Sequence, residues 1–274
     1  MTLQRRPHLN TLPFLVVLLS QVILALVSCH TKPEVNIQSR QGLTLIDSTA
    51  LEEDAELMPF DSTDRMAFYP VYYLGEAADT IALGHHPVSM FYNEKRDGKY
   101  DAARNWAAYT DRNMSIRVDT SLLLAYKRYF AHLEDKTGNE IVDSAKYYKA
   151  FPVFIINHSD SLLMPGSHNL VSKMIREAMD EDGRWVEVEE KVSFFCGTAK
   201  RDLVVDPKTI LIAKLLRYRG DTTVKFRLKF EFLNQGVYSR IYSNTFTDYF
   251  DKAQLRALAL SRFAAHNPKL KSNF

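Results

Sequence analysis

The chain has 274 residues and a formal net charge of +2, with 35 basic and 33 acidic residues. This length suffices for one large domain or two small ones, each with a hydrophobic core of its own. Because the charges nearly balance, the chain lacks the basic excess that nucleic-acid binding requires, and we expect no nucleic-acid partner.

The chain begins with the features of a secretory signal peptide, which we place at residues 1–28. Arg5 and Arg6 precede an apolar block over residues 12–27, which is too short for a membrane-spanning helix of roughly 20 residues. The block ends in LVSC at residues 26–29, and this run resembles the lipobox of bacterial lipoproteins. An ordinary secreted protein with a chance cysteine is the alternative interpretation.

The resemblance implies a lipid anchor. In that family a peptidase cuts before the cysteine, so Cys29 would become the first mature residue and carry the acyl chains, palmitate among them. Two or more acyl chains hold a protein firmly on a membrane. The next residue is His30, where an aspartate would favour the inner membrane, so the family's sorting rule implies an outer-membrane lipoprotein. Whether it faces the periplasm or the cell surface stays open.

Cysteine usage excludes a disulfide framework. The only cysteines are Cys29 and Cys196, and an acylated Cys29 cannot form a disulfide. An exported chain without disulfides depends on its core for stability. We interpret Cys196, in SFFCGTAK, as a structural thiol; a nucleophile activated by a nearby histidine is the alternative.

Residues 29–65 comprise the anchor cysteine and a polar, increasingly acidic stretch. Such a stretch buries little apolar surface, so we expect a solvated tether. The run NIQSRQGLTLI within it could still add a strand.

Residues 69–84 and 151–166 contain similar sequences, YPVYYLGEAADTIALG and FPVFIINHSDSLLMPG. Further matches follow in the same order, including RDGKY with EDGRW. We therefore expect an internal duplication, with one β-rich unit over residues 66–148 and a related one over 149–250. The alternative is that strand-rich chains reuse similar strands and turns.

The pattern within these units favours strands. Residues 223–233, TVKFRLKFEFL, alternate apolar and charged side chains, which is typical of a strand with one buried face. Residues 168–183 could form an amphipathic helix. Their counterpart contains a proline and adjacent aromatics, however, and both stretches end in an Asp-Gly pair typical of hairpins. We expect a mainly β fold of two related β-sandwich-like units, resembling uncharacterised lipoproteins with immunoglobulin-like or fibronectin-like sandwiches. A single α+β domain is the alternative.

Residues 251–274 predict a C-terminal amphipathic helix and tail. Asp251 and Gln254 have the spacing of an N-cap and its partner, and Pro268 ends the run. The apolar stripe that we expect to dock on the sandwich consists of Leu255, Leu258 and Phe263.

Two motifs have a structural and a functional interpretation. The Arg-Gly-Asp sequence at residues 219–221 is found in integrin-binding loops, but here it lies between two predicted strands, where we expect a hairpin turn. His158, Asp160 and His168 could converge on a metal ion, but they lack the tight spacing of known metal motifs. We interpret them as surface turn residues and expect no metal site.

Aromatic residues are the one compositional excess, with 14 Tyr and 16 Phe. Flat aromatic faces bind sugars and peptides, although aromatics also fill sandwich cores. The speculative ligand-binding residues are Tyr72, Tyr92, Tyr100 and Trp106.

No phosphate-binding glycine loop or Gly-x-Ser-x-Gly elbow is present in the sequence, and we expect no cofactor. The leading hypothesis is a membrane-anchored, non-catalytic module that binds an envelope protein, peptide or glycan. A periplasmic or surface hydrolase and a structural subunit of an envelope complex are the alternatives.

Overall fold

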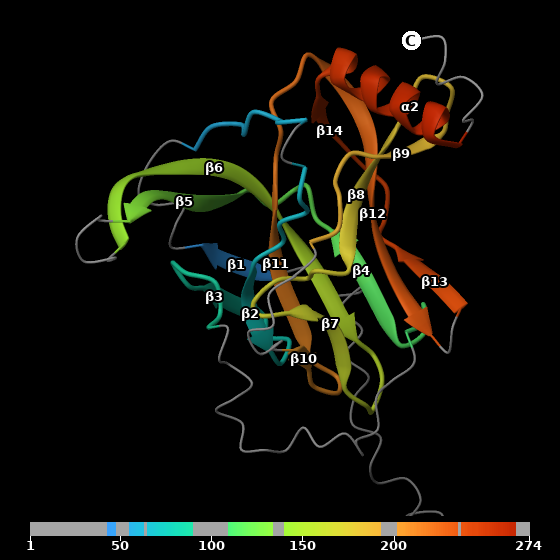
Figure 1. Cartoon of the computed structure of the whole chain (residues 1–274). Helices are drawn as coiled ribbons and strands as arrows, with labels where there is room; N and C mark the ends of the chain where they lie inside the picture. Colours follow the sequence, from blue (N-terminus) through green and yellow to red (C-terminus); the bar gives the residue numbers. More distant parts are fainter. Residues whose placement is uncertain are drawn as a thin grey trace, which may run out of the picture. The chain divides into compact units, whose positions relative to one another are not determined.

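The computed structural model describes residues 43–47, 55–62, 65–89, 109–133, 140–192, 202–234 and 237–266. These residues form several antiparallel sheets and a C-terminal helix, so the expected mainly β class is confirmed (Figure 1). In this part of the chain, no helix is both long enough and apolar enough to span a membrane.

The first five-stranded sheet is built around a central buried strand. Its order is β2 (Val71–Gly75), β11 (Ile210–Leu216), β6 (Glu140–Asn157) and β4 (Met114–Val118), and β5 (Leu124–Leu133) also pairs with β6. All seven residues of β11 are buried, which explains why its sequence is apolar except for Lys214.

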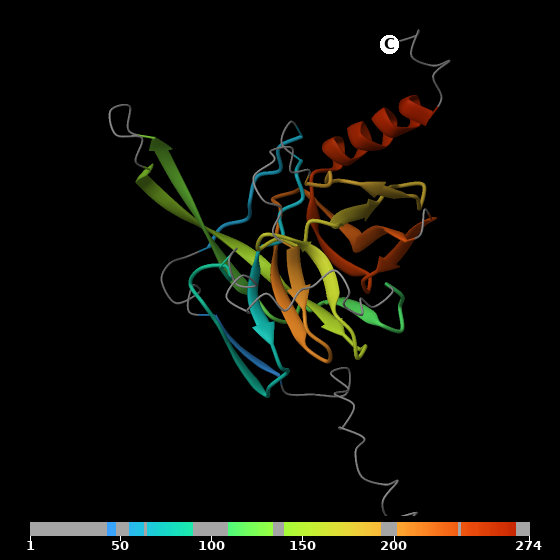
Figure 2. The same cartoon turned by 60° about the horizontal axis from the view of Figure 1, so that its bottom comes forward.

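β6 is long enough to pair with two successive strands along one side. Its C-terminal part pairs with β4 and its N-terminal part with β5, while β11 pairs along the other side. Beyond β11 the two strands continue as a hairpin, which projects from the rest of the sheet (Figure 1, Figure 2). We call this element the β5–β6 hairpin.

The second five-stranded sheet confirms the alternation predicted for residues 223–233. Its order is β13 (Val237–Tyr242), β12 (Thr222–Asn234), β8 (Met174–Met179) and β9 (Trp185–Glu187), and β14 (Phe246–Phe250) also pairs with β12. The apolar residues at the alternating positions of β12 are buried: Val224, Phe226, Leu228, Phe230 and Phe232.

One hydrophobic core joins the two sheets. Val153 of β6 and Leu211 of β11 belong to the same buried cluster as Phe226 and Phe230 of β12. At one edge, the side-chain amide of Asn244 accepts a hydrogen bond from the Val118 N–H at 2.8 Å and donates one to the Val118 carbonyl at 3.0 Å. These two bonds tie the β13–β14 connection to β4, so the sheets are joined by polar as well as apolar contacts.

The two predicted units do not form separate sheets. The predicted boundary between residues 148 and 149 lies inside β6, and the first sheet contains strands from both sides of it. Residues 42–274 instead form one compact unit. Local sequence similarity does not determine strand pairing, which depends on contacts between residues far apart in the chain.

The strands of the proposed repeat also differ in their partners. β3 (Thr80–Leu83) pairs in parallel with β1 (Thr44–Asp47), whereas β7 (Leu163–Ser167), at the corresponding place, pairs antiparallel with β10 (Asp202–Val205). The RDGKY match lies outside the described residues. The duplication itself therefore stays a prediction.

The strand interpretation of residues 168–183 is confirmed, because they contain β8 and lead into a tight turn before β9. Gly183 has a φ of 77°, a conformation that suits glycine, and the Asp180 carboxylate accepts hydrogen bonds from the N–H groups of Asp182 and Arg184. The Asp-Gly signal thus marks a hairpin here, as expected.

The predicted tether needs a correction, because described residues between 43 and 62 belong to the folded unit. Residues 44–47 form β1, and Glu56 and Met58 make bridges to Tyr148 and Tyr218. The possibility that this stretch adds a strand is confirmed. Its polar composition is misleading, since Asp47 is buried in an ion pair with Lys214.

The C-terminal helix α2 (Lys252–His266) begins at the predicted N-cap. The Gln254 N–H donates to Asp251 Oδ1 at 2.8 Å, but the Gln254 side chain extends to the Phe60 carbonyl instead of completing a capping box. Leu255 and Leu258 are buried, as predicted. The side chain of Phe263 lies outside the described residues.

The Arg-Gly-Asp sequence is not in a hairpin. It connects β11 of the first sheet to β12 of the second, and a Cβ on Gly220 would lie 2.1 Å from the carbonyl carbon of Phe250. Asp221 accepts a hydrogen bond from the Lys252 N–H at the start of α2. Close packing of the chain therefore explains the glycine, and helix capping explains the aspartate.

Candidate functional site

A pocket of about 640 Å³ lies against the β5–β6 hairpin. Its other walls come from residues 58–61 and 66–68, from the end of β11 and from the segment after β9. This volume is within the range of roughly 300–1,000 Å³ that is typical of small-molecule sites. The pocket is therefore the candidate functional site.

The buried end of the pocket contains a complete polar cluster around Glu189. Its carboxylate accepts hydrogen bonds from the Tyr69 hydroxyl, from the Tyr218 hydroxyl at 2.9 Å and from the Arg176 N–H at 3.0 Å. Arg176 Nε lies 3.2 Å from Glu189 Oε1 as an ion pair without hydrogen-bond geometry, and both side chains are only 2% exposed. Three donors and the Arg176 guanidinium thus surround the Glu189 carboxylate, while Arg176 Nε makes no hydrogen bond in the described part of the chain.

Arg176 is held on its remaining sides as well. Its Nη2 donates to the Leu216 carbonyl at 2.7 Å, and its guanidinium lies 4.3 Å from the centroid of the Tyr218 ring. Burial is the largest single effect and would lower the pKa of Arg176, but Glu189, together with smaller contributions from Tyr218, Tyr69 and Asp248, raises it overall. Burial, and secondarily Glu189, raises the pKa of Tyr69. The cluster therefore holds a fixed arginine cation and a neutral tyrosine.

The β5–β6 hairpin presents one face of its two strands to the pocket. Cross-strand partners on this face are Tyr126 with Tyr148 and Arg128 with Lys146, and Phe130 follows toward the tip. Both cationic side chains are exposed, and both lie over the Phe130 ring, at 5.5 and 5.9 Å from its centroid. A pair of cations therefore marks the outer part of this wall.

The opposite wall exposes apolar side chains beside these cations. Met66 is 52% exposed and Phe68 is 39% exposed, although both line the pocket. Phe68 packs edge-on against Tyr126, with ring centroids 5.7 Å apart. The mouth of the pocket thus combines apolar surface with positive charge.

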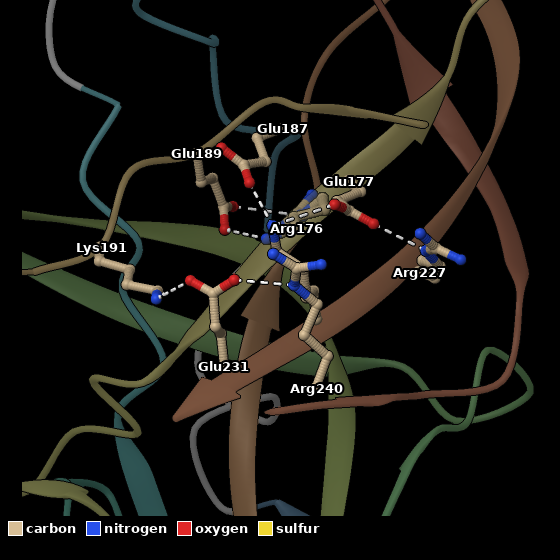
Figure 3. Close-up of polar contacts among 9 residues, drawn as sticks. Arg176, Glu177, Glu187, Glu189, Lys191, Arg227, Glu231 and Arg240 are labelled. Carbon is tan, nitrogen blue, oxygen red and sulfur yellow. Dashed lines mark hydrogen bonds and ion pairs between the residues drawn. The ribbon is translucent and has the colours of Figure 1, made fainter. Parts of the chain in front are cut away.

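A second polar cluster lies on the second sheet, on the face opposite the core (Figure 3). Glu177 pairs with Arg227 at 2.7 Å, and Glu231 pairs with Lys191 and with Arg240. Lys191, and secondarily Arg240, lowers the pKa of Glu231 to about 2. Such pairs of opposite charge stabilise the sheet.

Of the four residues predicted for ligand binding, the structure describes only Tyr72. Tyr72 is only 5% exposed, and Lys214 Nζ lies 4.1 Å from its ring centroid beneath the β1 strand. Tyr72 therefore belongs to the interior packing. Tyr92, Tyr100 and Trp106 lie outside the described residues, as do Cys29 and Cys196.

The histidine group has other partners. His158 Nε2 lies 2.8 Å from Ser115 Oγ, and Asp160 pairs with Lys208 at 3.6 Å. His168 has a φ of 57° in the turn after β7. Among the residues with described positions, no three histidine, cysteine or acidic side chains are placed to hold a metal ion.

The sequence reasoning did not find the pocket residues. Arg128 and Lys146 lie on different strands of the hairpin, and no local pattern links Arg176 to either of them. A same-face pattern in β5, with Tyr126, Arg128 and Phe130 at alternate positions, was the only local signal.

No family model, curated protein or solved structure matches the chain.

Proposed function

We propose that the chain is a membrane-anchored lipoprotein of the bacterial envelope, whose β domain binds a small ligand in the pocket without transforming it. Cys29 is the proposed anchor, and the lipobox-like run at residues 26–29 supports this part. The pocket beside the β5–β6 hairpin supports the binding part.

The state of Glu189 is the observation that favours binding over catalysis. A general base or nucleophile needs a free lone pair within reach of substrate. Glu189 instead accepts three hydrogen bonds, so three of its roughly four acceptor sites are used, and its carboxylate also faces the Arg176 cation at 3.2 Å. Such a cluster shapes a wall of the pocket rather than moving protons.

The binding part is tested by recovery of the natural cargo. The full chain is purified from membranes, and the small molecules bound to it are extracted and measured by mass spectrometry. Met66→Trp fills the mouth of the pocket, whereas Leu233→Trp places the same side chain at an exposed position on β12. We expect the wild type and Leu233→Trp to release one small molecule in an amount close to one per protein chain. Met66→Trp should release little or none of it. Absence of any such molecule from the wild type would refute the binding proposal.

The anchor part is tested by cell fractionation. Cys29→Ser removes the sulfur that would carry lipid, so the protein should move from the membrane fraction to the soluble one. Cys196→Ser, the matched change at the other cysteine, should leave the protein in the membrane fraction. Firm membrane attachment of Cys29→Ser would contradict the assignment.

A further inference from the structure

We propose that the ligand is a single-chain acidic amphiphile, meaning a long apolar chain with a carboxylate or phosphate head, and that Arg128 and Lys146 hold the head. This inference rests on the proposed pocket-binding function and specifies its ligand class. It is carried by the position of the two cations relative to each other and to the apolar walls.

Arg128 and Lys146 are direct cross-strand partners in an antiparallel ladder. Like charges at such positions repel and destabilise the pair. Within the described part of the chain, neither cation takes part in an ion pair, whereas most neighbouring charges on the second sheet do. An anion between them would replace repulsion with attraction on both sides. A pair of unbalanced cations at a pocket mouth is the arrangement that an anionic head requires.

The charges deeper in the pocket do not offer a competing site. Three cations and two carboxylates line it, but Arg176 and Glu189 neutralise each other at the buried end. Asp61 is exposed. The positive charge that remains is therefore at the mouth, which places the head of the ligand outward.

The walls next to these cations are suited to an apolar chain. Met58, Met66, Phe68, Tyr126 and Phe130 all line the pocket. Methionine side chains adapt to irregular apolar ligands, and exposed apolar surface beside a cavity is typical of a binding site. The chain of the ligand would cover Met66 and Phe68, which the protein alone leaves exposed.

An extended peptide fits the site less well. Peptides that bind along strands use free backbone groups of a sheet edge. Here the backbone beside the pocket is already bonded, because the Glu56 N–H donates to the Tyr147 carbonyl and the Lys149 N–H donates to the Glu56 carbonyl. The hairpin offers side chains to a ligand at this place.

The test compares two photoactivatable ligands that differ only in the head. The full chain in zwitterionic phosphatidylcholine nanodiscs is irradiated with hexadecanoic acid or hexadecan-1-ol, each with a mid-chain diazirine, and labelled peptides are identified by mass spectrometry. We expect the acid to label peptides containing residues 58–68 or Phe130, and the alcohol to label them roughly tenfold less. Competition with dodecyl phosphate against dodecanoate identifies which head the site prefers.

The double variant Arg128→Gln/Lys146→Gln should reduce labelling by the acid roughly tenfold. Lys127→Gln/Lys149→Gln is the matched control, since it removes two cations from the other face of the same two strands. Thermal unfolding separates binding from folding: the first double variant should be at least as stable as the wild type, because the repulsion is gone.

Two results would overturn the ligand class. Equal labelling of pocket peptides by acid and alcohol, unaffected by the charge variants, would show a neutral ligand class. Labelling displaced only by an apolar peptide with a free C-terminus would show a peptide site. In both cases recovery of a cargo from the purified protein would still support pocket binding, so the two proposals fail separately.

Discussion

Glu189→Gln tests the cluster at the buried end of the pocket most directly. The substitution keeps the size of the side chain and removes its charge. It leaves Arg176, which is 2% exposed, without the carboxylate that pairs with it. The amide group of glutamine also replaces one acceptor oxygen with an NH2 donor, so it cannot accept the hydrogen bonds of both Tyr69 and Tyr218 as the carboxylate does. The variant therefore places an uncompensated charge in the interior.

The expected loss follows from the burial of both partners. Removal of one member of a buried ion pair costs about 3–5 kcal/mol of the free energy of unfolding. For a domain of this size, that loss lowers the midpoint of thermal unfolding by roughly 6–20 °C. By contrast, replacement of both partners by apolar residues, Arg176→Met/Glu189→Leu, should cost less than Glu189→Gln alone, because no buried charge remains.

Circular dichroism measures both thermal and urea unfolding of these variants. Glu190→Gln is the matched control one position along, where the side chain is 61% exposed and pairs with Arg65. We expect its effect to stay below about 1 kcal/mol. Equal stabilities of Glu189→Gln and Glu190→Gln would refute the reasoning, since burial alone separates the two sites.

Three further predictions concern other parts of the fold. Gly220→Ala should destabilise by at least about 2 kcal/mol, because its Cβ would meet a β14 backbone carbonyl carbon at 2.1 Å. Gly183→Ala, with open space but a φ of 77°, should cost about 1 kcal/mol; urea midpoints of the two variants check the order. Lys191 lowers the pKa of Glu231 to about 2. The ionised carboxylate therefore stabilises the fold at pH values above the pKa of an ordinary glutamate, and this stabilisation is lost as the pH falls through about 2. Glu231→Gln should therefore be less stable than the wild type at neutral pH, by less than about 1 kcal/mol, and equal to it near pH 2 in an acid unfolding series. Lys214→Met should lower the free energy of unfolding by about 3–5 kcal/mol, because it leaves the buried Asp47 without its ion-pair partner. A loss no larger than that caused by replacing an exposed lysine with methionine would contradict the importance of this ion pair.

Local sequence patterns predicted the elements of this protein well where each element depends on its own residues. The alternation in β12 places apolar side chains on one face of any strand, and the Asp-Gly pair before β9 and the Asp251 cap before α2 act within a few residues. These predictions are confirmed because strand pleat and helix capping are short-range effects. The signal-peptide and lipobox interpretation also depends on adjacent residues, and it stays a prediction.

Tertiary contacts decided the rest. The division at residue 148 fails because β6 takes partners from both halves of the chain, and strand pairing is set by burial of whole faces rather than by similarity between segments. Asp47 looked like part of a solvated tether but is buried against Lys214, which only the folded chain brings near.

The sequence by itself determined the mainly β class and the hairpin and cap signals, because these depend on neighbours along the chain. The pocket was decided by the tertiary structure alone. The register of β5 on β6 sets Arg128 opposite Lys146, and the packing of distant segments buries Arg176 with Glu189. These charges acquire a partner, or a like-charged neighbour, because folding brings together residues that are far apart in the sequence.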